Sequence, residues 1–144
     1  MIYTTMTKKA MQISYQAHKD QVDKSGIPYI FHPIHLAEQM ETEEAVIVAL
    51  LHDVVEDTDW SIQALEKEGF SKDITDALGL LTHHDDMDYL DYIGKIKKSS
   101  SSHAKIVKIA DLKHNSDLSR FDHIDEEIMR RVEKYAKAIS ILAE

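Results

Sequence analysis

The sequence contains no cysteine among its 144 residues, and only four glycines and two prolines. Without thiols the chain forms no disulfide and has neither a thiolate metal ligand nor a thiol nucleophile, which suits a reducing compartment. The scarcity of glycine and proline argues against an all-β protein, whose many turns need them, and favours helices. We therefore expect a cytoplasmic protein of the all-α class.

Long apolar runs are also missing. No apolar segment approaches the roughly 18 residues that a membrane span requires, so no membrane partner is expected. The first residues lack the basic stretch and apolar run of a signal peptide. Because the apolar fraction of 43% is ordinary and no linker or repeat is found, we expect a single domain over residues 1–144. The predicted architecture is a helical bundle of about seven to eight helices.

Positive charge is scarce as well, with 17 Lys and Arg against 26 Asp and Glu, and the net charge is −9. Proteins that coat nucleic acid usually carry a basic face, so no nucleic acid polymer is expected as a partner. Segment 95–113 is an exception, because it has six lysines and a single acid, Asp111. These lysines form either a solvated helix face or a local attraction for the phosphate of a small nucleotide.

Helical periodicity and capping residues predict the order of the elements. Residues 24–29 form a loop because Ser25-Gly26 and Pro28 break helices. Residues 83–88 form a polar loop, and the serine run 99–102 is predicted to be a mobile loop. The predicted helices span residues 5–23, 30–40, 43–55, a segment from a cap at Asp59 or Ser61 to Gly69, 71–81, 89–97, 103–116 and 125–143.

The dipeptide His-Asp occurs twice, at His52-Asp53 and His84-Asp85, which is close to the frequency expected from composition. Context separates the two copies. His84-Asp85 belongs to the polar loop and is predicted to be solvated. His52-Asp53 closes the run Ala45–Leu51, which is apolar all round and therefore predicted to be buried. Unpaired charges are rarely buried, so the predicted burial of His52-Asp53 requires a compensating cation.

Two further acids, Glu56 and Asp57, follow on the same predicted helix. At about 100° per residue, Glu56 lies one turn above His52 and Asp57 one turn above Asp53, so all four share one face. Such a face offers two metal ligands and, one turn later, two carboxylates in reach of an attacking water as a general base. The alternative is a solvated acidic helix end, which the helix macrodipole disfavours.

Three more residues complete a candidate metal site. Asp111 is one acid within a mostly apolar helical segment, which indicates a charge turned inward. Asn115 lies on the same face, four residues on, and is either a helix-end residue or a hydrogen-bonding group for ribose or phosphate. His32 precedes Pro33 at the start of a predicted helix, and a lone histidine is more often structural than a ligand. Two His and two Asp suit one divalent metal: Mn²⁺, Fe²⁺, Co²⁺ or Zn²⁺.

Three segments around these residues carry a family resemblance. They resemble, in the same order, the hydrolase domain of the RelA/SpoT family and its stand-alone small relatives, which belong to the HD superfamily. The resemblance extends over about residues 3–118. The three segments are Lys24–Pro33 (KSGIPYIFHP), Leu50–Thr58 (LLHDVVEDT) and Lys108–Asn115 (KIADLKHN).

The resemblance implies an HD-type hydrolase that removes the 3′-pyrophosphate of the alarmone (p)ppGpp with the help of Mn²⁺. It also implies a hydrolase-only protein, since no synthetase or regulatory region follows. The H…HD…D order of the superfamily implies that the metal ligands are His32, His52, Asp53 and Asp111. The remaining roles that it implies are the handling of the nucleophilic water by Glu56 and Asp57, contact of Lys24 with guanine, and a hold on the ribose by Asn115.

The sequence departs from the family pattern at three places. Asp23 stands where the family usually has Arg, Leu112-Lys113 where it has Arg-Leu, and Leu118 where a Thr often helps on the phosphate side. The metal ligands are intact, whereas the guanine and phosphate contacts are altered. Three functions follow: a (p)ppGpp 3′-pyrophosphohydrolase, an HD phosphohydrolase acting on another nucleotide, or a non-catalytic nucleotide-sensing HD module. A sensor has no need of the Glu56-Asp57 pair, and the oligomeric state stays open.

Overall fold

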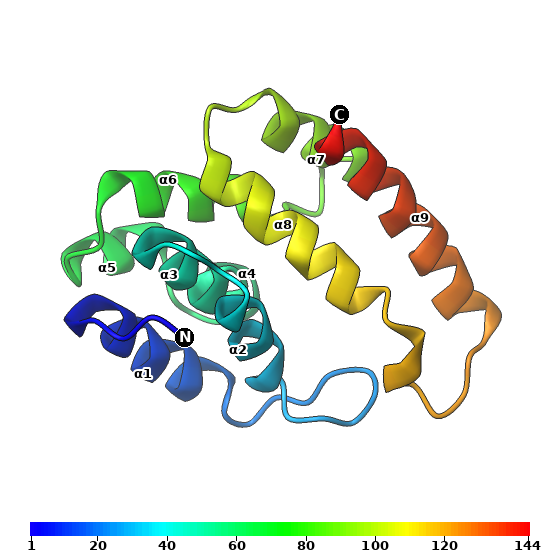
Figure 1. The fold of residues 1–144 in the computed structure, drawn as a ribbon, viewed down its shortest axis with the longest axis horizontal. Helices are drawn as coiled ribbons and strands as arrows, with labels where there is room; N and C mark the ends of the chain where they lie inside the picture. Colours follow the sequence, from blue (N-terminus) through cyan, green and yellow to red (C-terminus); the bar gives the residue numbers. More distant parts are fainter.

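The computed structural model describes residues 1–144 and is built from helices (Figure 1). Eight α-helices have six residues or more and a ninth, α4, is a single turn, so the predicted all-α class is confirmed. The elements are α1 (Thr5–His18), α2 (Phe31–Glu38), α3 (Glu43–Leu51), α4 (Val54–Asp57), α5 (Ile62–Lys67), α6 (Lys72–Leu81), α7 (Tyr89–Lys98), α8 (Ser102–Asn115), the 3-10 turn η1 (Leu118–Arg120) and α9 (Glu126–Ala143).

Helix α3 is the centre of the core. Thr42 caps its first turn by accepting a hydrogen bond from the amide of Ala45, and Glu43 and Glu44 suit the positive end of the helix dipole. Every residue from Ala45 to Leu51 is buried, as the all-round apolar run predicts. These residues belong to one hydrophobic cluster of 28 residues, which draws on helices from α1 to α9.

The predicted helix 43–55 is wrong at its end, because α3 stops at Leu51 and a separate turn, α4, begins at Val54. Asp53 lies between the two with φ −103° and ψ −1°, outside the usual helical well. The ring of His52 donates from Nδ1 to the carbonyl oxygen of Ala49 at 2.6 Å, which satisfies a carbonyl that the helix end leaves free. The predicted continuous helix is therefore interrupted, although the amide of Asp57 still donates to the carbonyl of Asp53 at 2.9 Å, so that Asp57 stays one turn after Asp53.

The first helix ends earlier than predicted, at His18 instead of residue 23. Residues 19–30 form a loop in which Val22 and Pro28 make an isolated β-bridge. Gly26 has a positive φ of 84°, a conformation that favours glycine. The longer loop brings Asp23 into contact with Arg120 and leaves Lys24 exposed.

Several predicted helix starts are confirmed by side-chain caps. Ser61, Ser71 and Asp125 each accept a hydrogen bond from the third amide of the helix that follows. Residues 99–101 lie between α7 and α8, as predicted for the serine run, and the prediction is wrong only at Ser102, the first residue of α8, which Ser101 caps. The turn η1 was not predicted from the sequence.

Helix α8 lies between two groups of helices (Figure 1). It packs on α2, α3 and α6 on one side and on α9 on the other. Helix α9 also packs on α7, as expected of an amphipathic cover. None of the helices combines the length and the apolar character needed to cross a membrane. The packing of α3 on α8 brings the end of α3 opposite the middle of α8.

Candidate metal centre

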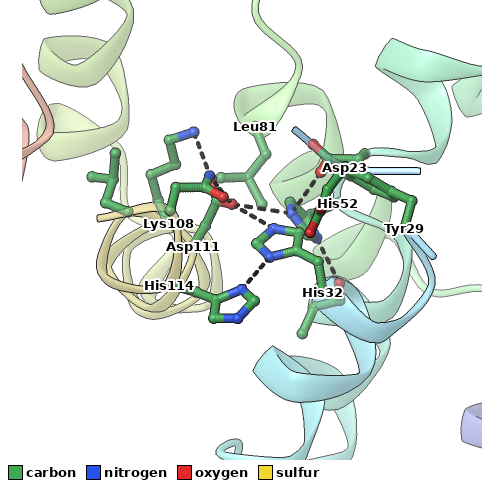
Figure 2. A network of polar contacts seen from close by, with 12 residues as sticks. Asp23, Tyr29, His32, His52, Leu81, Lys108, Asp111 and His114 are labelled. Carbon is green, nitrogen blue, oxygen red and sulfur yellow. Dashed lines mark hydrogen bonds and ion pairs between the residues drawn. The ribbon is translucent and has the colours of Figure 1, made fainter. Parts of the chain in front are cut away.

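Four side chains from separate parts of the chain converge where α2, the α3–α4 junction and α8 meet (Figure 2). One ligand atom from each of them lies within 4.8 Å of all the others. His32 Nε2 is 2.8 Å from Asp111 Oδ1, and His52 Nε2 is 3.0 Å from Asp53 Oδ2. The structure thus brings together all four residues that the sequence singled out as ligands: His32, His52, Asp53 and Asp111.

The orientation of His52 shows that this cluster requires a cation. Its Nδ1 donates to the carbonyl of Ala49, so Nε2 is the atom that faces the cluster. Nε2 is buried and faces two carboxylates, 3.0 Å from Asp53 and 3.5 Å from Asp111. A lone pair against two carboxylates is repulsive, so a proton or a metal ion must lie between them. A histidine that is fixed through one nitrogen and offers the other is typical of metal ligands.

The charges within the cluster hold both aspartates ionised. Burial opposes the charge of Asp53, but the imidazole of His52 lowers the pKa of Asp53 to about 2. Burial is likewise outweighed at Asp111, whose pKa lies well below its ordinary value because of Lys108 and the two histidines. Burial alone would lower the pKa of His52, yet Asp53 and Asp111 hold it well above its ordinary value. The cluster therefore binds a proton tightly where a metal would replace it.

Lys108 supports the cluster from within α8 (Figure 2). Its ammonium group lies 2.9 Å from Oδ2 of Asp111, and its side chain is only 12% exposed. The same cation lies over the ring of Tyr92, 5.2 Å from the centroid, which stabilises it further. Of the six lysines in segment 95–113, Lys108 is the one that contacts the candidate ligands. Its position three residues before Asp111 was the available signal.

Two further side chains contact the aspartates. The hydroxyl of Tyr29 donates to Oδ2 of Asp53, and the amide of Asn115 donates to Oδ1 of Asp111 at 3.0 Å. The predicted sharing of a helix face by Asp111 and Asn115 is thus observed as a direct contact. Tyr29 lies within the segment used for the family resemblance, although the sequence alone gave it no role. Such contacts fix the direction of the carboxylate oxygens.

His114 contacts His32, the other histidine of the cluster. Its Nδ1 lies 2.7 Å from Nδ1 of His32, and the two rings are stacked with centroids 4.9 Å apart. Burial and the nearby positive charge of Arg120 lower the pKa of His114 to about 4, so its ring is neutral. Nε2 of His32 faces the cluster, as that of His52 does, and with a metal ion on Nε2 the Nδ1 of His32 would donate to Nδ1 of His114. The sequence analysis missed His114.

Glu56 and Asp57 lie on the single turn α4, at the rim of the cluster, and both reach solvent. Burial of the carboxyl group and the charge of Asp53 raise the pKa of Glu56, and the same two causes raise the pKa of Asp57 to about 6. Oε1 of Glu56 accepts a hydrogen bond from the amide of His83 at 2.6 Å. Both carboxylates therefore lie within the electrostatic reach of Asp53, and that of Glu56 is also bound to the start of the loop between α6 and α7.

A cavity of about 330 Å³ opens next to the cluster and contains Lys24 and Asn115, the two predicted substrate contacts. Tyr29 connects it to the cluster. Partial burial and the positive charge of Arg131 lower the pKa of Lys24, against the opposing charge of Glu127. The lining carries three cations and one carboxylate. The full lining is Val22, Asp23, Lys24, Tyr29, Asn115, Arg120, Phe121, Arg131 and Tyr135. The residues from α9 were not predicted, because their signal, a basic and an aromatic side chain four residues apart, is common on covering helices.

An all-helical fold with two histidines and two aspartates converging on one point defines a class of proteins with a site suited to a divalent metal ion. Comparison with known proteins gives the family. The sequence model of the HD domain family matches residues 10–114, and the chain belongs to this family.

The chain is similar in sequence to several longer proteins. It is 31% identical over 134 residues to the "Probable GTP pyrophosphokinase" of Mycobacterium leprae, a match that covers 81% of this chain and 16% of the relative. It is 32% identical over 145 residues to the "Probable guanosine-3′,5′-bis(diphosphate) 3′-pyrophosphohydrolase" of Synechocystis sp., covering 91% and 19%. The chain thus spans less than a fifth of the length of these relatives.

A solved structure matches almost the whole chain. It superimposes with a TM-score of 0.80 at 26% sequence identity, and the match covers 99% of this chain and 88% of the other. That protein is described as a metazoan ortholog of SpoT that hydrolyses ppGpp. The agreement over this share of both chains shows that the helices of this chain follow the same arrangement.

Proposed function

We propose that this chain is a metal-dependent phosphohydrolase that removes the 3′-pyrophosphate from (p)ppGpp, yielding GDP or GTP and pyrophosphate. One observation carries the proposal: the four-residue cluster adjoins both the carboxylates of Glu56 and Asp57, whose pKa values the charge of Asp53 raises, and a cavity lined by three cations and one carboxylate. The relatives named for (p)ppGpp hydrolysis support the choice of substrate.

The cluster residues would hold one divalent ion, and Mn²⁺ is the ion that the family resemblance implies, with Fe²⁺, Co²⁺ and Zn²⁺ as alternatives. When bound, such an ion supplies Lewis-acid chemistry, polarising a phosphoryl oxygen and acidifying water. The ligands in this proposal are His32 and His52 through Nε2, and Asp53 and Asp111 through one carboxylate oxygen each. Tyr29, Lys108, Asn115 and His114 orient these four.

The carboxylates of Glu56 and Asp57 accept the proton of the attacking water. A raised pKa suits this role, because a base works best when its pKa lies close to the working pH. Water attacks the phosphorus joined to the 3′-oxygen, the bond between them breaks, and the 3′-oxygen leaves with a proton. Lys24 lines the cavity next to the cluster, and Asn115 connects this cavity to Asp111.

A second candidate is hydrolysis of another nucleotide by the same groups. The observation that favours it is the wall of the cavity at Asp23, where a carboxylate replaces the arginine usual in the family. A module that senses a nucleotide without turnover is the third candidate. The retained Glu56-Asp57 pair speaks against a sensor, because ligand binding needs no base.

The test is incubation of the purified protein with Mn²⁺ and a panel of nucleotides that includes ppGpp, with pyrophosphate and phosphate followed separately. Pyrophosphate with GDP from ppGpp is the expected result, and EDTA or Asp53→Ala should abolish it. Turnover of a different nucleotide would select the second candidate. Nucleotide binding without any turnover would leave the sensor.

A further inference from the structure

Asp23 and Arg120 form an ion pair across the cavity wall (Figure 2 shows Asp23). Nη2 of Arg120 lies 2.7 Å from Oδ2 of Asp23, although the two residues are 97 positions apart in the sequence. Both side chains are nearly covered, with exposures of 13% and 11%. The pair joins the 19–30 loop to η1, two segments that otherwise belong to separate parts of the fold.

Asp23 organises its own loop at the same time. Its Oδ1 accepts hydrogen bonds from the amide of Ser25 at 2.8 Å, the hydroxyl of Ser25 at 2.6 Å and the amide of Ile27 at 3.0 Å. The loop that carries Lys24 is therefore built around one oxygen of this carboxylate, and Arg120 is bound by the other. The position of Arg120 and the position of the loop are set by the same group.

Arg120 is held at two edges of its guanidinium group. Nη2 donates to Asp23, and Nη1 donates to the carbonyl of His114 at 2.8 Å. A planar guanidinium whose edges are bound stacks through its flat faces, and the guanidinium carbon of Arg120 already lies over the ring of Phe121. Asp23 and Arg120 line both the cavity of about 330 Å³ and a second cavity of about 400 Å³, so the pair stands as a partition between them.

The charges divide the cavity into two kinds of surface. Arg120 is neutralised by Asp23 and has an aromatic neighbour, Phe121, whose ring centroid lies 5.8 Å from the guanidinium carbon. Lys24 instead forms no ion pair and lies near Lys134 and near Arg131, which pairs with Glu127. A phosphate is attracted by cations that are not neutralised, whereas an aromatic base is accommodated by a flat face.

We propose that Arg120 forms the wall against which the base of the bound nucleotide stacks, and that Asp23 holds it there. This inference rests on the proposed function, because it assumes a nucleotide in the cavity. It makes Arg120 a specificity-determining residue and Asp23 a positioning residue. The base is then recognised by a guanidinium that comes from the segment after α8.

The test is equilibrium binding by calorimetry of GDP, UDP and inorganic pyrophosphate to the Mn²⁺-loaded protein. For Arg120→Met we expect a loss of about tenfold in affinity for GDP, a smaller loss for UDP with its smaller ring, and pyrophosphate affinity within about twofold of wild type. Arg120→Lys should not restore GDP binding, since it keeps the charge but has no flat face. Arg130→Met is the matched control, because Arg130 is exposed, pairs with Glu126 and lies outside this cavity.

Asp23→Asn tests the positioning role. The asparagine oxygen can still accept the hydrogen bonds of the loop, but the ion pair with Arg120 is lost. We expect a loss of about threefold to tenfold for GDP, and no further loss when Asp23→Asn is combined with Arg120→Met, because the two residues act as one unit. Thermal unfolding of each variant shows whether the loop and the fold are retained.

Three results would overturn the proposal. Full rescue by Arg120→Lys would show that charge alone matters. An equal loss for GDP and pyrophosphate would place Arg120 on the phosphates. If the wild type bound GDP and UDP no more tightly than pyrophosphate, the base would contribute nothing to binding and would not lie against Arg120. None of these measurements needs turnover, so GDP binding that depends on Arg120 in a protein inactive on ppGpp would contradict the proposed function and not this inference.

Discussion

The two His-Asp pairs of the chain have the same chemistry and opposite surroundings. His52-Asp53 lies at the junction of α3 and α4, with the histidine buried and both side chains in contact with other polar groups of the cluster. His84-Asp85 lies in the loop between α6 and α7, where both residues are exposed. The dipeptide therefore carries no function by itself. The buried helix end and the groups brought to it make the difference.

The largest expected effect comes from breaking the buried pair. Asp53→Ala removes a candidate ligand and the hydrogen-bond partner of Tyr29, so the metal is lost along with its Lewis-acid chemistry. Hydrolysis of ppGpp should fall by on the order of a thousandfold or more, about 4 kcal/mol in the barrier. The measurement is the initial rate of pyrophosphate release at saturating Mn²⁺.

Thermal unfolding gives a second readout for the same change. A metal that binds only the folded protein adds about 4 kcal/mol of stability at a thousand times its dissociation constant. This gain should be seen when Mn²⁺ is added to the EDTA-treated wild type and should be absent in Asp53→Ala. An equal gain in both proteins would mean that the metal binds elsewhere.

The second largest effect is expected from Lys108, a cation that lies beside the buried pair and has no counterpart beside the exposed pair. Lys108→Met leaves Oδ2 of Asp111 without its cation in a buried place, so the carboxylate is held and oriented less firmly. We expect a tenfold to hundredfold loss in Mn²⁺ affinity, typical of groups that orient ligands. Lys113→Met on the same helix is the control, since Lys113 is exposed. Unchanged affinity in Lys108→Met would exclude the orienting role.

The pH dependence tests the carboxylates that follow the buried pair. Partial burial and the charges of Asp53 and Glu56 raise the pKa of Asp57 to about 6. As the pH is lowered through about 6, Asp57 gains a proton and can no longer accept one, so kcat should fall by up to about tenfold per pH unit. Asp57→Glu should move this acidic limb, whereas Asp85→Glu in the exposed loop should not.

Protonation of Asp57 would lower the rate without unfolding the protein. A carboxyl whose pKa is raised in the folded state binds its proton more tightly there than in the unfolded chain. Its contribution to stability therefore increases as the pH falls from about 6 towards the ordinary value of 3.8. Circular dichroism at pH 5 should show the folded protein, and loss of helical signal there would contradict the assignment of the limb to Asp57.

The smallest expected effect is at the exposed pair. His84→Ala combined with Asp85→Ala should leave the rate within about twofold of wild type and the free energy of unfolding within about 0.5 kcal/mol, as for surface residues without partners. Mn²⁺ should stabilise this variant as it stabilises the wild type. A large loss of activity would show that the loop takes part in the reaction, and the contrast between the two pairs would fail.

Local signals in the sequence were sufficient for the fold class and most helix starts. Ser71 and Asp125 cap helices because a short polar side chain next to a periodic segment satisfies free amides, whatever lies around it. The buried run Ala45–Leu51 was recognised because it has no polar side. The predictions failed where the signal is not local, as at the break after Leu51, which follows from the contacts of His52 and Asp53.

The candidate site divides in the same way. The ligand set could be named from the sequence, with His32 depending on the family resemblance. Lys108, Tyr29 and His114 lie within the recognised segments, yet nothing in the sequence pattern gives the atoms that they contact.

The sequence by itself determined an all-helical chain of the HD family, with acids and histidines placed where burial makes a cation necessary. Only the tertiary structure decided which oxygen of Asp111 faces His32, that Glu56 accepts a hydrogen bond from the amide of His83, and that Arg120 contacts Asp23. The physical reason is distance along the chain. Helix formation and capping depend on neighbours within four residues, whereas these contacts join residues up to 97 positions apart and exist only after the core around α3 has formed.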